Sequence, residues 1–335
     1  MSSETSQWLN ENVLVGYTDQ RGTAWHYKAS DQGSEPNHYP GAIPIGDVRR
    51  RLFFWEAEKV PMYVAGPTGN MIAVPNRIAV IRNESHDVLG VASTSYEPHQ
   101  YGEWLVDTLG NILDDDLQIG SAGLLKGGAI AWVQVEQPET RRAAGEVDYR
   151  SHLLATTSFN GSIATLYKPT VTVVVCDNTR NAALEEHTPE VRVRHTANSM
   201  VQLSVARDAL GIVLTMDKAF EAEVEELLSR RVSDRNYELF LKALIPLNDM
   251  NSKQAVSRND TITGDYMKLW QDDPRVAPWR GSAFGVVQAV NTYRQHIRPT
   301  RGSSNVIERN MMDTLTGVTE QQDKKALELL DLICV

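Results

Sequence analysis

The dipeptide Asn160-Gly161 is the feature that most constrains the fold, because it separates two β-prone runs, residues 152–159 and 162–167. A type I′ turn needs a positive φ angle at both central residues, and Asn-Gly supplies it most readily. Residues 170–176 follow, nearly all β-branched and without polar alternation. Such a run is typical of a strand covered on both faces. The stretch therefore predicts a tight hairpin next to a strand in the middle of a sheet.

Further strands are predicted before this hairpin. Residues 129–135 form an apolar run, and shorter β-prone runs alternate with turn residues at 61–65, 71–74, 77–82 and 88–91. Apolar residues at helical spacing predict helices over 98–113 and 197–229. A short helix is also predicted over 48–55, which Asp47 starts and which ends before Pro61. The order of elements predicts an α+β fold, with an antiparallel sheet core in β-β-β-α order, flanking helices and a helical C-terminal region.

Composition divides the chain into three parts. Residues 1–45 are rich in Gly, Asn, Asp, Ser and Pro, which predicts an irregular arm that docks through its scattered aromatic residues. Residues 46–235 form the predicted α+β core, with a short helical link at 178–190. Residues 236–335 form the predicted helical region, with a polar loop at 248–260 and helices at 236–244, 281–297 and 319–333.

The length and the net charge of the chain limit the functions that it can have. The chain has 335 residues, 41% of them apolar and 23% charged, which is ordinary for a globular protein with a sizeable core. The net charge of −10 argues against a surface uniformly adapted to nucleic acid, but a local basic groove remains compatible with it. Two cysteines imply no disulfide framework, and no apolar run reaches membrane-spanning length. A cytoplasmic protein is expected.

Basic residues in the core are candidates for such a groove. Arg192 and Arg194 project from one face of a predicted strand, where they can meet phosphates or pair with the nearby acidic helix; both interpretations stay open. Trp132 and Tyr167 are candidates for stacking on bases. Lys126 lies in a Gly-rich stretch, but the Walker pattern is absent, which excludes ATP binding of that kind. The predicted nucleic-acid-binding residues are Lys126, Arg141, Arg142, Arg150, Lys168, Arg192 and Arg194.

An enzymatic function is the less favoured alternative. Its candidates are Cys176 as a nucleophile with His195, or a metal site made of Asp177, His195 and Asp208. A cysteine in a Val-rich strand is usually inert, because an apolar site raises the pKa of a thiol. No spacing typical of metal ligands is present. We therefore predict no catalytic residue, no metal and no cofactor.

Several stretches together resemble the phage/plasmid-like family, an uncharacterised family with a domain of unknown function found in actinobacterial phages and plasmids. The matching residues are 120–132, 138–139, 160–162, 170–179, 193–196, 210–211 and 289–296. The resemblance covers most of the chain from Val48 onward, whereas the N-terminal arm departs from it. It implies a mobile-element protein of a bacterial cytoplasm, with no established catalytic residues to transfer.

The predicted β-β-β-α order is also similar to the core of phage single-strand annealing proteins of the Redβ/RecT and Erf types. Those proteins assemble into rings or helices that hold DNA in a basic groove. The resemblance implies a single-stranded DNA-binding and annealing protein that acts in recombination or replication. We expect it to act as a homo-oligomer, without covalent catalysis and without binding a membrane. The alternative is a non-catalytic assembly or host-interaction protein, whose acidic surface binds a host or phage protein.

Overall fold

The computed structural model describes residues 11–21, 35–110, 117–137, 139–173, 178–181, 190–196, 199, 217–245, 253–300 and 306–333. The chain forms two compact units. The first comprises Met1–Pro138, His152–Pro169 and Pro189–Leu214. The second comprises Glu139–Ser151, Thr170–Thr188 and Thr215–Val335. The division at residues 45 and 235 stays a prediction, because compactness alone does not define a folding unit.

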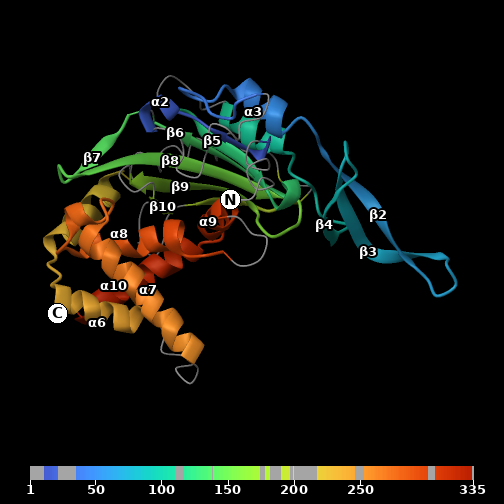
Figure 1. The fold of residues 1–335 in the computed structure, drawn as a ribbon. Coiled ribbons are helices and arrows are strands. Elements are labelled where there is room, and N and C mark those ends of the chain that lie inside the picture. Colours follow the sequence, from blue (N-terminus) through green and yellow to red (C-terminus); the bar gives the residue numbers. More distant parts are fainter. Residues whose placement is uncertain are drawn as a thin grey trace. The chain divides into compact units, whose positions relative to one another are not determined.

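The main sheet has eight strands, and its strand order is β1-β5-β6-β8-β9-β10, with β11 beside β9 and β7 beside β8 (Figure 1). The strands are β1 (Val13–Val15), β5 (Gln118–Leu125), β6 (Ile130–Glu136), β7 (Arg141–Ala143), β8 (Val147–Ser158), β9 (Thr165–Val173), β10 (Asn178–Asn181) and β11 (Val191–Val193). The described pairings are antiparallel, which confirms the predicted fold class. Strand β8 begins in the second unit and ends in the first, whereas β9 begins in the first unit and ends in the second.

The predicted hairpin is present, but its turn is wider than predicted. Strands β8 and β9 are separated by residues 159–164, and Gly161 has a φ of 72° whereas Asn160 does not have a positive φ. The type I′ prediction is therefore wrong. The Asn160 side chain accepts a hydrogen bond from the Ser162 backbone N–H at 3.0 Å, so it caps the loop locally. Ser158 closes the loop by exchanging hydrogen bonds with the backbone of Ile163.

Strand β9 joins two segments that the sequence separates at Lys168-Pro169. Proline lacks an N–H and is tolerated in a strand only where no partner needs one. Strand β11 pairs with residues 165–167 and β10 with residues 170–173, so Pro169 lies between the two pairings. Strand β10 also replaces the start of the predicted helical link at 178–190, because its backbone continues the ladder along β9.

A second, three-stranded sheet contains β2 (Ala57–Ala65), β3 (Met71–Arg82) and β4 (Val88–Ser93), in that order. The strands predicted between residues 61 and 91 are confirmed, with 71–74 and 77–82 merged into one. The end of the β2–β3 ribbon projects from the rest of the first unit (Figure 1). In the predicted N-terminal arm, the described residues include strand β1, which pairs with β5, and the short helix α2 (Thr18–Arg21), so residues 13–21 are not irregular as predicted.

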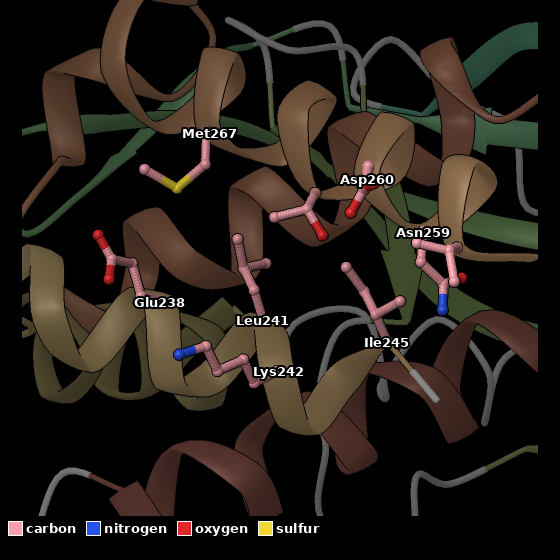
Figure 2. Close-up of a pocket in the computed structure, with 9 residues that line it drawn as sticks. Glu238, Leu241, Lys242, Ile245, Asn259, Asp260 and Met267 are labelled. Carbon is pink, nitrogen blue, oxygen red and sulfur yellow. The ribbon is translucent and has the colours of Figure 1, made fainter. Parts of the chain in front are cut away.

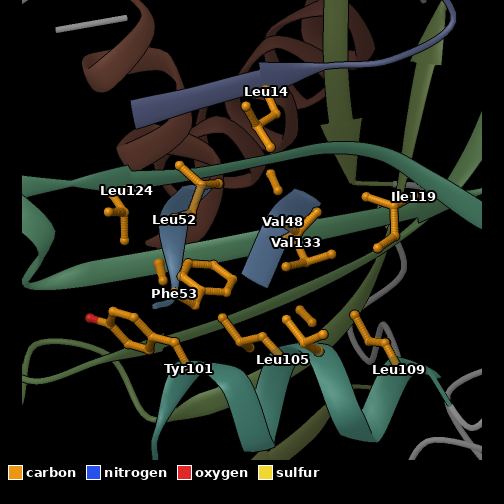
Figure 3. Close-up of a cluster of buried hydrophobic side chains, with 14 of the residues drawn as sticks. Leu14, Val48, Leu52, Phe53, Tyr101, Leu105, Leu109, Ile119, Leu124 and Val133 are labelled. Carbon is orange, nitrogen blue, oxygen red and sulfur yellow. The ribbon is translucent and has the colours of Figure 1, made fainter. Parts of the chain in front are cut away.

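The helices of the first unit cover one face of its sheet. They are α2 (Thr18–Arg21), α3 (Ile45–Leu52), the π-helix η2 (Gly102–Asp107) and α4 (Thr108–Gly110). A short 3₁₀ turn, η3 (Lys126–Gly128), joins β5 to β6. Figure 3 shows side chains of α3 and η2, such as Leu52 and Leu105, converging with Val133 of the sheet in a buried apolar core.

The second unit is mainly helical. Its named helices are α6 (Asp234–Leu244), α7 (Lys253–Asp272), η4 (Ala277–Trp279), α8 (Ala283–Thr292), the π-helix η5 (Tyr293–Ile297), α9 (Val306–Leu315) and α10 (Val318–Ile333). The helices predicted at 236–244, 281–297 and 319–333 are confirmed. The polar loop predicted at 248–260 is wrong from Lys253 onward. Helix α7 forms there because Tyr266, Leu269 and Trp270, near its C-terminal end, bury one face in the core of this unit.

Candidate functional site

The predicted cations of the first unit gather at one end of its sheet. The pairings Leu125↔Ile130, Ile130↔Ser158 and Thr165↔Val193 place the β5–β6 turn, the β8–β9 turn and the end of β11 at that same end. We call this the turn end of the sheet. The exposed side chains that it carries from the predicted set are Lys126, Arg192 and Arg194.

Two of the exposed cations at the turn end have a defined setting. Lys126 lies in the η3 turn with a positive φ of 52°, and its side chain is exposed. Arg192 is 62% exposed and lies 2.8 Å from Glu190. Exposed ion pairs of this kind contribute only about 0–1 kcal/mol, so a phosphate can replace the carboxylate. The Arg192 guanidinium is therefore available to an anionic ligand.

The other predicted cations are engaged within the fold. Arg141 lies 2.5 Å from Asp217, and Arg142 donates to both carboxylate oxygens of Asp148, at 2.6 and 3.0 Å. The Arg142 guanidinium also lowers the pKa of Asp148. Arg150 and Lys168 are buried. A charge motif alone does not reveal such burial, because it depends on strands and helices distant in the sequence.

Trp132 and Tyr167 are not available for base stacking, because each is only 1% exposed. The indole of Trp132 occupies the space above Gly123, where a Cβ atom would overlap it. The Tyr167 hydroxyl donates a hydrogen bond to the carbonyl of Trp104 at 2.6 Å. Both residues are core side chains, and the prediction that they stack on bases is wrong.

An exposed aromatic residue lies at the turn end instead. Phe54 is 55% exposed, and the Arg82 guanidinium carbon lies 5.3 Å from its ring centroid and 4.5 Å from that of Trp55. Trp55 in turn contacts Phe159, at 5.9 Å between ring centroids, and borders Gly128 of the β5–β6 turn. The Phe54–Arg82 pair thus flanks the turn end.

Sequence reasoning missed Phe54 because it placed the residue inside a predicted helix over 48–55. Helix α3 ends at Leu52, and the backbone of Phe53 turns away from helical geometry. Three consecutive aromatic residues at 53–55 were the available signal, since three neighbours on a helix cannot share one buried face. Phe53 and Trp55 are buried, which leaves Phe54 in solvent.

A column of stacked rings supports the end of β11. His195 stacks on Tyr96 and on His99, with ring centroids 4.9 and 4.1 Å apart, and His99 stacks on Trp104 at 3.7 Å. His195 Nε2 lies 3.1 Å from the Thr157 hydroxyl, and His99 Nδ1 lies 2.6 Å from that of Thr165. The inward-facing His195 ring anchors the backbone beside Arg194.

Both imidazoles of the column resist protonation. Burial, with a repulsion from His195, lowers the pKa of His99 to about 3, and burial lowers the pKa of His195 to about 4. Their second ring nitrogens, His99 Nε2 and His195 Nδ1, have no hydrogen-bond partner among the described residues. The column is therefore neutral near pH 7 and acts as a packed support, not as a source of charge.

The enzymatic candidates are only partly described. Cys176, Asp177 and Asp208 lie outside the described residues. His195, proposed as their partner, is held in the ring column. Among the described residues, no group of three or more His, Cys, Asp or Glu side chains could hold a metal ion.

Buried polar residues also occur on the sheet itself. Glu136 and His152 are paired across β6 and β8, with Oε2 and Nδ1 3.0 Å apart, and both side chains are buried. Gly120 makes room for this carboxylate, because a Cβ atom there would overlap it. The sequence contains no local motif that identifies the pair, since its members are far apart in the chain.

A cavity of 410 Å³ lies between α6 and α7 in the second unit (Figure 2). Figure 2 shows Leu241 of α6 and Ile245, just after the end of α6, along its lining, with Asp260 of α7 opposite. The lining is mainly apolar, and its charged side chains are Lys242 and the two acidic residues Glu238 and Asp260, whose net negative charge disfavours phosphate. The cavity therefore suits an apolar group better than a nucleic-acid backbone.

Comparisons with known proteins place the chain in a family. No curated protein and no solved structure matches it. Among the described residues, no helix is long and apolar enough to span a membrane. The model of a family described as a domain of unknown function, DUF932, matches residues 88–315, which include the main sheet from β5 onward and the ring column. The chain therefore belongs to the DUF932 family.

Proposed function

We propose that this chain is a single-stranded DNA-binding and annealing protein, which acts as an oligomer without covalent catalysis in the recombination or replication of a mobile element such as a phage. The observation that carries the proposal is the turn end of the sheet, where exposed Phe54 packs against the Arg82 guanidinium and the neighbouring Trp55 borders the β5–β6 turn that holds Lys126. Proteins that bind single strands without sequence preference combine stacking aromatic residues with nearby cations.

The net charge of −10 does not oppose a local site of this kind. At 0.15 M ionic strength the Debye length is about 8 Å, so distant acidic residues are largely screened from the turn end. Arg192 and Arg194 then act on phosphates at short range, while Phe54 offers a ring face to a base. Stacking contributes about 1–3 kcal/mol per base, which supports sequence-independent binding.

The proposal is tested by binding of labelled single-stranded DNA across a salt series. We expect Phe54→Ala to weaken binding by about fivefold to 150-fold, the equivalent of one lost stacking contact. Phe54→Trp should preserve it, because the indole offers an equal or larger ring face. Absence of salt-sensitive binding by folded wild-type protein, or equal affinity of the alanine variant, would reject the turn end as the DNA site.

The contribution of Arg192 and Arg194 can be measured separately in the same experiment. Each phosphate neutralised on a single strand contributes about 0.7 to the slope of log K against log salt. The double variant Arg192→Ala/Arg194→Ala should therefore reduce that slope by about 1.4. Arg235→Ala on α6, an exposed arginine of the second unit, is the matched control and should leave the slope unchanged. Accelerated annealing of complementary strands by the wild type, weakened in both turn-end variants, would complete the case.

A second candidate function is binding of a protein partner through the acidic helix over 217–229. Its residues Phe220, Val224 and Leu227 are buried in the core of the second unit, while Glu225 and Glu226 are exposed. An acidic face held on a rigid helix is suited to a basic protein surface. Capture of one specific protein by the wild type, abolished by Glu225→Lys/Glu226→Lys, would favour this candidate; unchanged capture would exclude the helix.

A further inference from the structure

The outer face of the three-stranded sheet is apolar yet exposed. On β3, Ile78 and Val80 point into the core of the first unit, so Arg77, Ala79 and Ile81 point the opposite way. The register places Val60 and Val91 beside Ala79, and Glu58 and Val88 beside Ile81. Val88 is 65% exposed and Val91 48%, whereas Val60 and Ile81 are half-buried and the small Ala79 between them is buried. We call this surface the outer face.

The β2–β3 ribbon extends this apolar surface beyond the body of the unit. Tyr63, Val64, Met71 and Ile72 are all about half exposed or more. Monomers rarely expose contiguous apolar patches larger than a few hundred Å², and larger patches mark interaction surfaces. A specific interface buries about 1,000 Å² or more in total, which is about 500 Å² from each of two identical copies.

The charges on the outer face are self-complementary. Glu58 lies at one end of the face, beside Ile81, and Arg77 lies at the other end, beside Ser93. Both are exposed, and neither forms an ion pair with another described residue. A two-fold axis near Ala79 and perpendicular to the strands brings the Glu58 end of one copy over the Arg77 end of the next. An interface between identical copies requires this arrangement, in which residue i meets residue j twice.

We propose that the outer face of β2–β4 is a dimer interface, and that its occupant is the same face of a second copy of this chain. Val60, Val88 and Val91 form its apolar centre, and Glu58 of each copy pairs with Arg77 of the other. Sheets packed face to face in this way lie about 10 Å apart, a distance that opposing Glu and Arg side chains span together. The proposed function includes an oligomer, and the outer face supplies one interface of that oligomer. The dimer proposal rests on the proposed function in this point alone.

Charge reversal tests the interface without DNA. The wild type is expected to sediment at twice the 37.4 kDa mass of the chain. Glu58→Arg and Arg77→Glu should each weaken self-association at least tenfold, because like charges then face each other twice. An equimolar mixture of the two variants should restore the dimer, since every contact in the mixed pair is again between opposite charges. No merely structural role of either residue predicts that restoration.

Two further variants complete the design. Val91→Asp places a charge in the apolar centre and should yield a monomer with an unchanged circular dichroism spectrum. Glu103→Arg makes the same charge change at an exposed site on η2, away from the sheet, and should remain dimeric. A monomeric wild type, or mixed charge variants that stay monomeric, would overturn the proposal. Because Phe54 lies outside this face, Phe54→Ala should dimerise normally, so loss of DNA binding and loss of the dimer are separable.

Discussion

Acidification from pH 8 to pH 5 is expected to destabilise the first unit through His99 and His195. The pKa of His99 is about 3 in the folded chain and that of His195 about 4, because both rings are buried. In the unfolded chain a histidine has a pKa of about 6.5. Between these values the unfolded state binds more protons than the folded state, so stability rises with pH. The free energy of unfolding therefore begins to fall as the pH drops through about 6.5, and it stops falling near the pKa values of the two histidines in the folded chain.

The size of the effect follows from the same pKa values. At pH 5 the folded His99 stays neutral, whereas protonation lowers the free energy of the unfolded chain by about 2 kcal/mol per histidine. His99 is only 3% exposed, so we count that term in full. His195 is partly exposed, and solvent screening reduces its share to roughly half. Together they remove about 3 kcal/mol of unfolding free energy between pH 8 and pH 5.

Urea unfolding at the two pH values measures this loss, and His99→Phe isolates the larger share. A phenyl ring keeps the stack with Trp104 but cannot titrate, so the variant should lose about 2 kcal/mol less than the wild type between pH 8 and pH 5. His86→Asn, in an exposed turn where asparagine tolerates the positive φ, is the control and should behave as the wild type. A His99→Phe variant with the full pH dependence would refute the assignment.

Two packing predictions concern the cores. Gly123→Ala should lower the free energy of unfolding by about 1–3 kcal/mol, because its Cβ atom overlaps the Trp132 indole; an unchanged thermal midpoint would contradict this packing. Asp323→Ala should cost about 3–5 kcal/mol, because it leaves the buried Arg294 guanidinium, 3.4 Å from Asp323, without this carboxylate. Lys324→Ala, at the half-buried Lys324–Glu320 pair on the same helix, should cost less than about 1 kcal/mol in the same chemical denaturation series.

The sequence alone determined the elements whose signals are local. Apolar residues at helical spacing located the helices at 236–244, 281–297 and 319–333, and β-prone runs located the strands on both sides of Asn160-Gly161. It also indicated the fold class, because consecutive strands joined by short turns must pair antiparallel. Helix α7 escaped this reasoning, because its first half is polar and only its later turns reach the core.

The tertiary structure alone decided which chemical groups remain accessible. Residue type identified Lys126, Arg150 and Arg192 equally as cations, but burial by distant strands removed Arg150 from the surface. The accessibility of an aromatic residue likewise depends on its neighbours in space: Gly123 admits Trp132 to the core, whereas helix α3 ends before Phe54 and leaves it exposed. Local patterns specify backbone conformation, while burial and pairing depend on residues far apart in the chain. For that reason the turn end and the outer face appear only in the folded molecule.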